Sequence, residues 1–291
     1  MGMRYLIHTI VRIQMTFYER LRAVQVHTQS VLCVGLDPDP VRMPQHLLLG
    51  ASHADAVMRF NEAIIRATAP YACAYKLNFA FFETLGRRGY DVLDYTRSLI
   101  PSSTLVVADA KRGDIGNSAS KYAKAVFELL DFDACTVAPY MGRDAVAPFL
   151  AYENKAAFIL VRTSNPSGQE FQAQIIDGRP LYEFVAERAV RWEHNLPGTI
   201  GFVVGATHRD EPARLRTRFP RTPFLMPGVG AQGGSLEDAA MAANAEGGVL
   251  VSSSRSILYA SDGEDFAVRA AEAARALSKN LKEALQPGTL C

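Results

Sequence analysis

Eight short apolar runs recur along the chain, separated by longer segments of mixed polarity. Each run is almost continuously apolar, which is typical of strands buried on both faces of a parallel sheet. The runs lie at residues 31–37, 72–78, 105–111, 134–140, 157–163, 199–206, 223–229 and 248–254. This pattern predicts eight parallel strands.

Between these runs, apolar residues recur at intervals of three and four, as they do on one face of a helix. The clearest such segments are residues 15–26, 54–69, 118–130, 178–194, 235–246 and 264–285. Within 118–130, the apolar positions that we expect on the buried face are Tyr122, Val126, Leu129 and Leu130.

The alternation of strands and helices predicts an α/β fold, a closed (β/α)8 or TIM barrel in a single domain. A doubly wound sheet would carry a G-x-G-x-x-G motif after an early strand, but the first run ends in GLDPDP. We expect residues 15–291 to form the barrel as one catalytic domain. Residues 1–14 are expected to be an N-terminal extension, either disordered or helical.

Charge and hydropathy exclude several classes of partner. The 31 basic and 30 acidic residues give a net charge of +1, and no basic block is interleaved with aromatic residues. We therefore expect no nucleic-acid or membrane partner. No apolar run reaches the roughly 18 residues of a membrane-spanning helix. The first apolar stretch is interrupted by His8 and Arg12 and lacks a cleavage site, which argues against a secretory signal.

The cysteines and histidines indicate neither a disulfide framework nor a metal site. Cys33, Cys73 and Cys135 lie in apolar runs, Cys291 ends the chain, and no C-x-x-C motif occurs. We expect buried thiols in a cytoplasmic protein. The six histidines lack metal-ligand spacing, so no metal is predicted.

Charged residues end the second and third predicted strands. Lys76 ends one, and ADAKRGDIG supplies Asp109, Lys111 and Asp114 at the other. Because the carboxyl ends of barrel strands meet on one face, these side chains are expected to form an array of alternating charge. One interpretation is a structural ion cluster. The other, which we favour, is a catalytic site, because buried ion pairs are weak stabilisers.

A glycine-rich segment follows the seventh predicted strand and a serine-rich segment follows the eighth, at the usual phosphate position of barrels. MPGVGAQGGS supplies Gly230, Gln232 and Gly233, and VSSSRS supplies Arg255. Glycines let backbone N–H groups approach an anion, and arginine can bind phosphate oxygens in a bidentate way. The alternative is two flexible loops and a surface arginine.

Asp37, Ser164 and Asn165 have two interpretations each, and His208 has one. Asp37 in GLDPDP either accepts a sugar hydroxyl or caps a helix, a role that Asp39 would fill as well. Ser164 and Asn165 in RTSNPSG either read the amide edge of a base or form a polar turn. His208 is interpreted as a solvated loop residue.

The combined motifs GLDPDP, YKLN, DAKRGDIG, RTSNPSG and PGVGAQGG resemble orotidine 5′-phosphate decarboxylase, in its longer bacterial (type 2) branch. The resemblance implies decarboxylation of orotidine 5′-monophosphate (OMP) to UMP, in pyrimidine biosynthesis, without a cofactor. Lys111 would protonate C6 as carbon dioxide leaves, beside Asp109 and Lys76.

The resemblance also implies how the nucleotide is held. Asp37 would bind a ribose hydroxyl and Ser164 the pyrimidine. Gln232, its neighbouring glycines and Arg255 would bind phosphate. Family members form homodimers in which the second aspartate of the motif, here Asp114, reaches the partner's site. Where many members have proline then threonine, this chain has IGNSA, and Ser118 would supply the hydroxyl.

Two other functions stay open from the sequence. A Mg²⁺-dependent sugar-phosphate lyase of the same suprafamily shares D-x-K-x-x-D, and a silent phosphate-binding barrel could act as a sensor. GLDPDP and RTSNPSG favour a nucleotide over a linear sugar, and the complete array of charges argues against a sensor.

Overall fold

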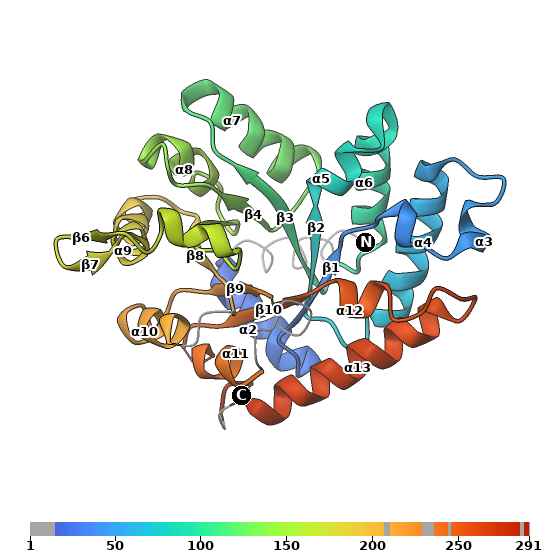
Figure 1. The fold of residues 1–291 in the computed structure, drawn as a ribbon. Helices are drawn as coiled ribbons and strands as arrows, with labels where there is room; N and C mark the ends of the chain where they lie inside the picture. Colours follow the sequence, from blue (N-terminus) through green and yellow to red (C-terminus); the bar gives the residue numbers. More distant parts are fainter. Residues whose placement is uncertain (1–14, 207–209, 229–235, 244–245, 286–287, 291) are drawn as a thin grey trace, which may run out of the picture.

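The computed structural model describes residues 15–206, 210–228, 236–243, 246–285 and 288–290, and it contains a closed parallel barrel. The barrel order is β1-β10-β9-β8-β5-β4-β3-β2, so neighbours in sequence are neighbours in space (Figure 1). The strands are β1 (Leu32–Leu36), β2 (Ala74–Asn78), β3 (Leu105–Arg112), β4 (Ala134–Val137), β5 (Ala156–Arg162), β8 (Thr199–Val204), β9 (Phe224–Pro227) and β10 (Val249–Ser253). The predicted TIM barrel is confirmed.

Helices surround the strands on the outside of the barrel (Figure 1). They are α3 (Gln45–Leu48), α4 (His53–Thr68), α5 (Phe79–Glu83), α6 (Gly89–Leu99), α7 (Gly116–Lys124), α8 (Arg143–Leu150), α9 (Leu181–Glu193), α10 (Glu211–Arg218), α11 (Leu236–Ala242), α12 (Arg255–Leu258) and α13 (Phe266–Ala284). A further helix, α2 (Phe17–Thr28), precedes the first strand. Short 3-10 segments lie at Pro40–Arg42, Gly86–Arg88 and Pro166–Glu170.

All eight predicted strands are present, most of them shorter than the predicted runs, whereas β3 extends one residue further, to Arg112. The run 134–140 forms a strand only to Val137, because Pro139 has no N–H to donate to a neighbouring strand. The first and last strands close the barrel, with Cys33 opposite Ser252 and Val34 opposite Ser253.

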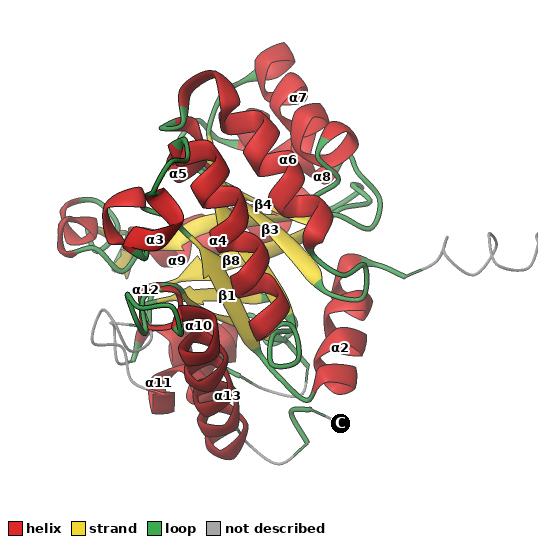
Figure 2. Cartoon of the chain, turned by 90° about the vertical axis from the view of Figure 1, so that its right-hand side faces the viewer, coloured by secondary structure: helices red, strands yellow, loops and turns green. Residues whose placement is uncertain are grey.

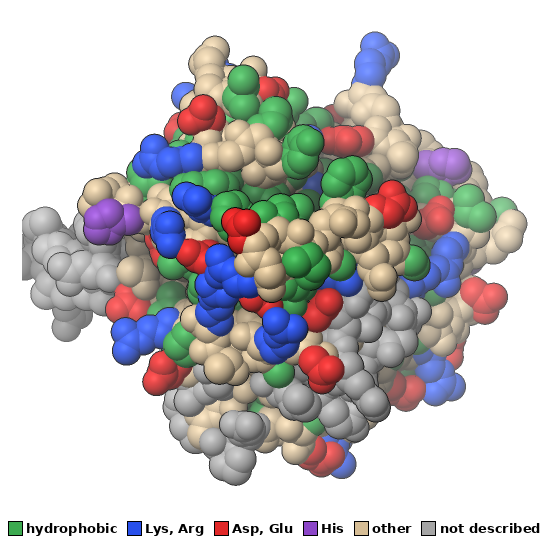
Figure 3. All heavy atoms as spheres, turned by 60° about the vertical axis from the view of Figure 1, so that its left-hand side comes forward, with side chains coloured by type: hydrophobic (Ala, Val, Ile, Leu, Met, Phe, Trp, Pro, Cys, Tyr) green, Lys and Arg blue, Asp and Glu red, His purple; other side chains and the backbone are tan. Residues whose placement is uncertain are grey.

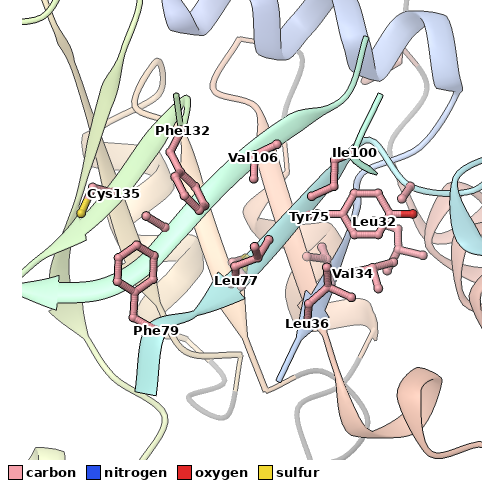
Figure 4. Close-up of a cluster of buried hydrophobic side chains, with 14 of the residues drawn as sticks. Leu32, Val34, Leu36, Tyr75, Leu77, Phe79, Ile100, Val106, Phe132 and Cys135 are labelled. Atoms are coloured by element: carbon pink, nitrogen blue, oxygen red, sulfur yellow. The ribbon is translucent and has the colours of Figure 1, made fainter. Parts of the chain in front are cut away.

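The larger hydrophobic core lies between the barrel wall and the outer helices. Figure 4 shows part of it, where Val34, Leu77 and Val106 from three adjacent strands pack with Phe79 and Phe132. All five side chains are buried, and none is more than 3% exposed. This layer fixes the outer helices to the strands.

A second core fills the inside of the barrel, and α2 closes one end of it. Phe17 and Leu21 of α2 are fully buried with inward-facing strand residues, and Phe17 packs edge-on against Phe158 at 5.9 Å between ring centroids. Each such side chain contributes roughly 1.5–3 kcal/mol by burial. Thr16 and Glu19 form a capping box that starts the helix. Figure 2 shows α2 apart from the outer helices.

One predicted helix face is partly wrong. Val126 and Leu130 are buried as expected, but Leu129 is 71% exposed and Tyr122 is also at the surface. The segment Ala125–Leu129 is a π-helix, whose wider turn rotates the following side chains away from the α-helical positions. Spacing alone does not reveal this change.

The surface and two short elements complete the fold. An antiparallel hairpin, β6 (Ile175–Ile176) with β7 (Arg179–Pro180), was not predicted.

Acidic and basic side chains are interspersed on the face in Figure 3. No helix within the described part of the chain is long and apolar enough to cross a membrane. Cys33, Cys73 and Cys135 are free and buried, as predicted.

Candidate active site

A cavity of about 680 Å³ opens at the carboxyl ends of the barrel strands. Every strand of the barrel contributes a lining residue or is followed by one. In the order of the strands along the chain, from β1 to β10, these include Asp37, Lys76, Asp109, Thr136, Leu160, Val203, Leu225 and Ser252. The predicted convergence of strand ends is therefore confirmed.

The centre of the cavity is an array of alternating charges, defined here as Asp37, Lys76, Asp109 and Lys111. Lys76 Nζ lies 2.8 Å from Asp109 Oδ2 and 3.7 Å from Asp37 Oδ1. Lys111 Nζ lies 2.6 Å from Asp109 Oδ1. The side chains of Lys76 and Asp109 are only 7% and 10% exposed, whereas that of Lys111 is 53% exposed. Lys111 is thus the ammonium that a ligand in the cavity can reach.

Neighbouring charges hold the buried members of this array ionised. Burial by itself raises the pKa of the Asp109 carboxyl, but Lys76 and Lys111 lower it by more, and the net pKa is well below the usual range. Burial by itself lowers the pKa of Lys76, whereas Asp109 and Asp37 raise it by more, and the net pKa is above the usual value. Both groups therefore stay charged at neutral pH.

Lys111 has an unusual backbone. Its φ is +45°, in the left-handed region that non-glycine residues rarely adopt. The pairing of β3 with β4 shifts register between Ala108 and Arg112, so Lys111 lies within an irregular part of the strand. Its N–H donates to Thr136 Oγ1 at 2.9 Å, a contact that the sequence analysis did not identify.

The first loop separates the roles of its two aspartates. Asp39 caps the following 3-10 turn by accepting from the Val41 N–H. Asp37 Oδ1 is buried and makes no hydrogen bond to any residue that the structure describes. Tyr259 holds the loop in place, because its hydroxyl donates to the Asp37 carbonyl and accepts from the Asp39 N–H. The side chain of Asp37 is 18% exposed and lines the cavity, where its carboxylate can accept from an incoming hydroxyl.

Ser164 and Asn165 line the cavity from the loop after β5. Thr163 Oγ1 donates to Asn165 Oδ1 at 2.6 Å, and Gln172 Nε2 donates to Thr163 Oγ1 at 2.8 Å. Gly205 lets this loop approach β8, since a Cβ there would lie 2.8 Å from the Ser164 backbone. Ser164 and Asn165 therefore belong to a polar turn and line the cavity at the same time.

The proposed phosphate residues are only partly described. Arg255 begins α12 directly after β10 and lines the cavity with Ser253, Ser254 and Gly228. Gly228 has a φ of +100°, which favours glycine. Gly230, Gln232, Gly233 and His208 lie outside the described residues.

Asp114 and Ser118 are not among the described residues that line the cavity of a single chain. Asp114 Oδ1 accepts from the N–H of Ile115, and Ser118 is exposed on α7. Sequence reasoning also missed Thr136, Arg42 and Tyr259 as lining residues. They lie in or beyond unremarkable runs, without a motif that would have identified them. No group of three or more His, Cys, Asp or Glu in the described ranges could hold a metal ion.

Three comparisons agree on the family. Residues 30–271 match the sequence model of the Orotidine 5'-phosphate decarboxylase / HUMPS family. The chain is 45% identical to an orotidine 5'-phosphate decarboxylase of Dehalococcoides mccartyi, covering 90% of this chain and 95% of that protein. It is 46% identical to the Herpetosiphon aurantiacus protein of the same name, covering 89% and 96%.

A solved structure extends the likeness to three dimensions. The structure of Leishmania donovani OMP decarboxylase is 37% identical, covers 93% of this chain and 99% of that chain, and superposes with a TM-score of 0.79. The sequence match spans the barrel and the residues of its charge array. The chain therefore belongs to the orotidine 5'-phosphate decarboxylase / HUMPS family.

Proposed function

We propose that the chain is a carboxy-lyase that decarboxylates OMP to UMP in pyrimidine biosynthesis. The observation that carries this proposal is the array of alternating charges, with one reachable ammonium, at the centre of the barrel cavity. The names of the relatives at about 45% identity support the decarboxylase over other chemistries of the family. We assign the catalytic domain to residues 15–291.

The chemistry follows from the charges. The bond between C6 and the carboxylate breaks, carbon dioxide leaves, and the electron pair stays on C6. The Lys111 ammonium stabilises the developing negative charge and donates a proton to C6, which leaves the lysine neutral until solvent reprotonates it. Asp109 lies beside the leaving carboxylate and anchors Lys111, while Lys76 keeps Asp109 ionised.

The remaining lining residues hold the nucleotide. Asp37, which lines the cavity, accepts a ribose hydroxyl. Ser164 and Asn165 face the pyrimidine. Gly230, Gln232, Gly233 and Arg255 bind the phosphate, where contacts far from C6 help to fix the reacting end.

The active enzyme is proposed to be a homodimer with shared sites. Asp114 is absent from the described cavity wall of its own chain, in accord with a role in the partner's site. Ile115 and Tyr140 follow β3 and β4 and are 52% and 92% exposed, as contact residues of a free protomer would be. Ser118 joins this proposed contact. The three buried free thiols support a cytoplasmic location.

We expect turnover of OMP without added metal, because Lys76 and Lys111 together balance the charges of Asp37 and Asp109, the two carboxylates that could attract a cation. The measurement is the loss of OMP absorbance in the presence of EDTA. Full activity in EDTA supports the decarboxylase. A loss that Mg²⁺ restores would instead favour the sugar-phosphate lyase.

Arg255→Ala is expected to weaken transition-state stabilisation for OMP by about 2–4 kcal/mol, the range of a charge-assisted contact. Turnover of the phosphate-free nucleoside should change little, because this side chain would contact only the phosphate. The ratio of kcat/KM values for the two substrates measures the difference. An equal loss on both substrates would mean that Arg255 is structural.

A further inference from the structure

Thr136 of β4 connects the two residues that carry the proposed chemistry. Its side chain is buried, at 1% exposure, and lines the cavity. Its Oγ1 accepts the Lys111 backbone N–H at 2.9 Å and donates to Asp109 Oδ1 at 3.1 Å. A threonine hydroxyl has one proton, so accepting from Lys111 leaves that proton for the carboxylate.

The Thr136 hydroxyl accepts a hydrogen bond from the Lys111 backbone N–H at a point where the pairing of β3 with β4 is irregular. The β3–β4 ladder is regular at Ala108 and resumes at Arg112, and the register shifts between them. Lys111 therefore lies where ladder hydrogen bonding is interrupted, and even a partly buried N–H without a partner is costly. The Thr136 hydroxyl replaces the missing strand acceptor.

The same contact opposes the strain at Lys111. A non-glycine residue at a φ of +45° persists only when its surroundings hold it there. Two interactions do so, and both lead to Asp109 Oδ1. The Lys111 ammonium reaches this oxygen directly at 2.6 Å, and the Lys111 N–H reaches it through Thr136.

We propose that Thr136 is a positioning residue that sets the Lys111 ammonium against Asp109 by fixing the strained backbone between them. The proposal rests on the proposed function for its kinetic readout. Without the hydroxyl, the backbone of Lys111 is free to relax, and the ammonium moves relative to C6. Displacements of about 1 Å can cost roughly 10²-fold in rate.

The test compares Thr136→Val, which keeps the shape but removes the hydroxyl, with Thr136→Ser, which keeps the hydroxyl. Thr136→Val is expected to lower kcat for OMP by about 10–100-fold and to change KM by less than about threefold. Thr136→Ser should recover most of kcat. Thr68→Val is the matched control, because Thr68 is also fully buried and hydrogen-bonded, to Ile64 and Tyr75, outside the cavity.

A merely structural role predicts a different result. Thr136→Val and Thr68→Val would then lose similar stability in thermal unfolding and both keep kcat within about twofold, which would overturn the proposal. Failure of the serine to restore kcat would also overturn it. Should the unaltered protein not decarboxylate OMP, the proposed function fails, and a crystal structure of Thr136→Val decides this inference separately. A relaxed Lys111 φ supports it, and an unchanged φ contradicts it.

Discussion

Lys111→Ala is expected to lower kcat for OMP by at least about 10⁴-fold, while UMP still binds. General acid catalysis contributes about 10²–10⁴-fold, and electrostatic stabilisation of a developing anion adds about 10²–10³-fold. The truncation removes both, because Lys111 is the exposed ammonium of the array. The proposed phosphate and ribose contacts lie on other strands and should remain. Steady-state turnover and calorimetric titration with UMP measure the two effects separately.

Lys279→Ala provides the control for a lost surface lysine. Lys279 pairs with Glu283 on α13, 73% exposed and outside the cavity lining, so its removal should leave kcat unchanged. Normal turnover in Lys111→Ala would show that another group delivers the proton. Loss of UMP binding together with turnover would show that Lys111 mainly holds the nucleotide.

An equal mixture of Lys111→Ala and Asp114→Ala is expected, after subunit exchange, to regain roughly a quarter of the activity of the unaltered enzyme. Each homodimer should be nearly inactive, since every shared site lacks one of the two charges. In a heterodimer, one site receives both intact residues and the other receives both defects. Equal mixing with random exchange makes half of the dimers mixed, and half of their sites are complete.

Native mass spectrometry establishes whether subunits have exchanged. A sample that contains only Lys111→Ala, taken through the same exchange procedure, controls for any activity that the procedure itself restores. If mixed dimers form and turnover does not return, Asp114 acts within its own chain. The shared-site proposal would then be wrong, although the decarboxylase proposal would stand.

The barrel could be predicted because its signal is repeated and local. β1, and β3 from Leu105 to Ala108, are buried on both faces, so they appear as continuous apolar runs. The array could be predicted because the fold brings strand ends together, whatever their separation in sequence. Asp109, Lys111 and Lys76 meet for that reason.

What could not be predicted depends on details that no local pattern encodes. The hydroxyl of Thr136 matters because β3 and β4 shift register beside it, and register is a property of two strands together. Likewise, Asp37 and Asp39 are equivalent as residue types within a turn. Only the geometry shows that Asp39 forms the cap and that Asp37 lines the cavity beside Lys76.

The pairing of the first strand with the last has a consequence for the protein during its synthesis. Cys33 on β1 meets Ser252 on β10, roughly 220 residues later, and ribosomes add about 5–20 residues per second. One edge of β1 therefore stays unpaired for tens of seconds during synthesis, and an unpaired edge of an apolar strand is prone to aggregation. The cavity, too, draws residues from Asp37 to Tyr259, so no nascent chain has a complete site until α12, which follows the last strand, has also emerged.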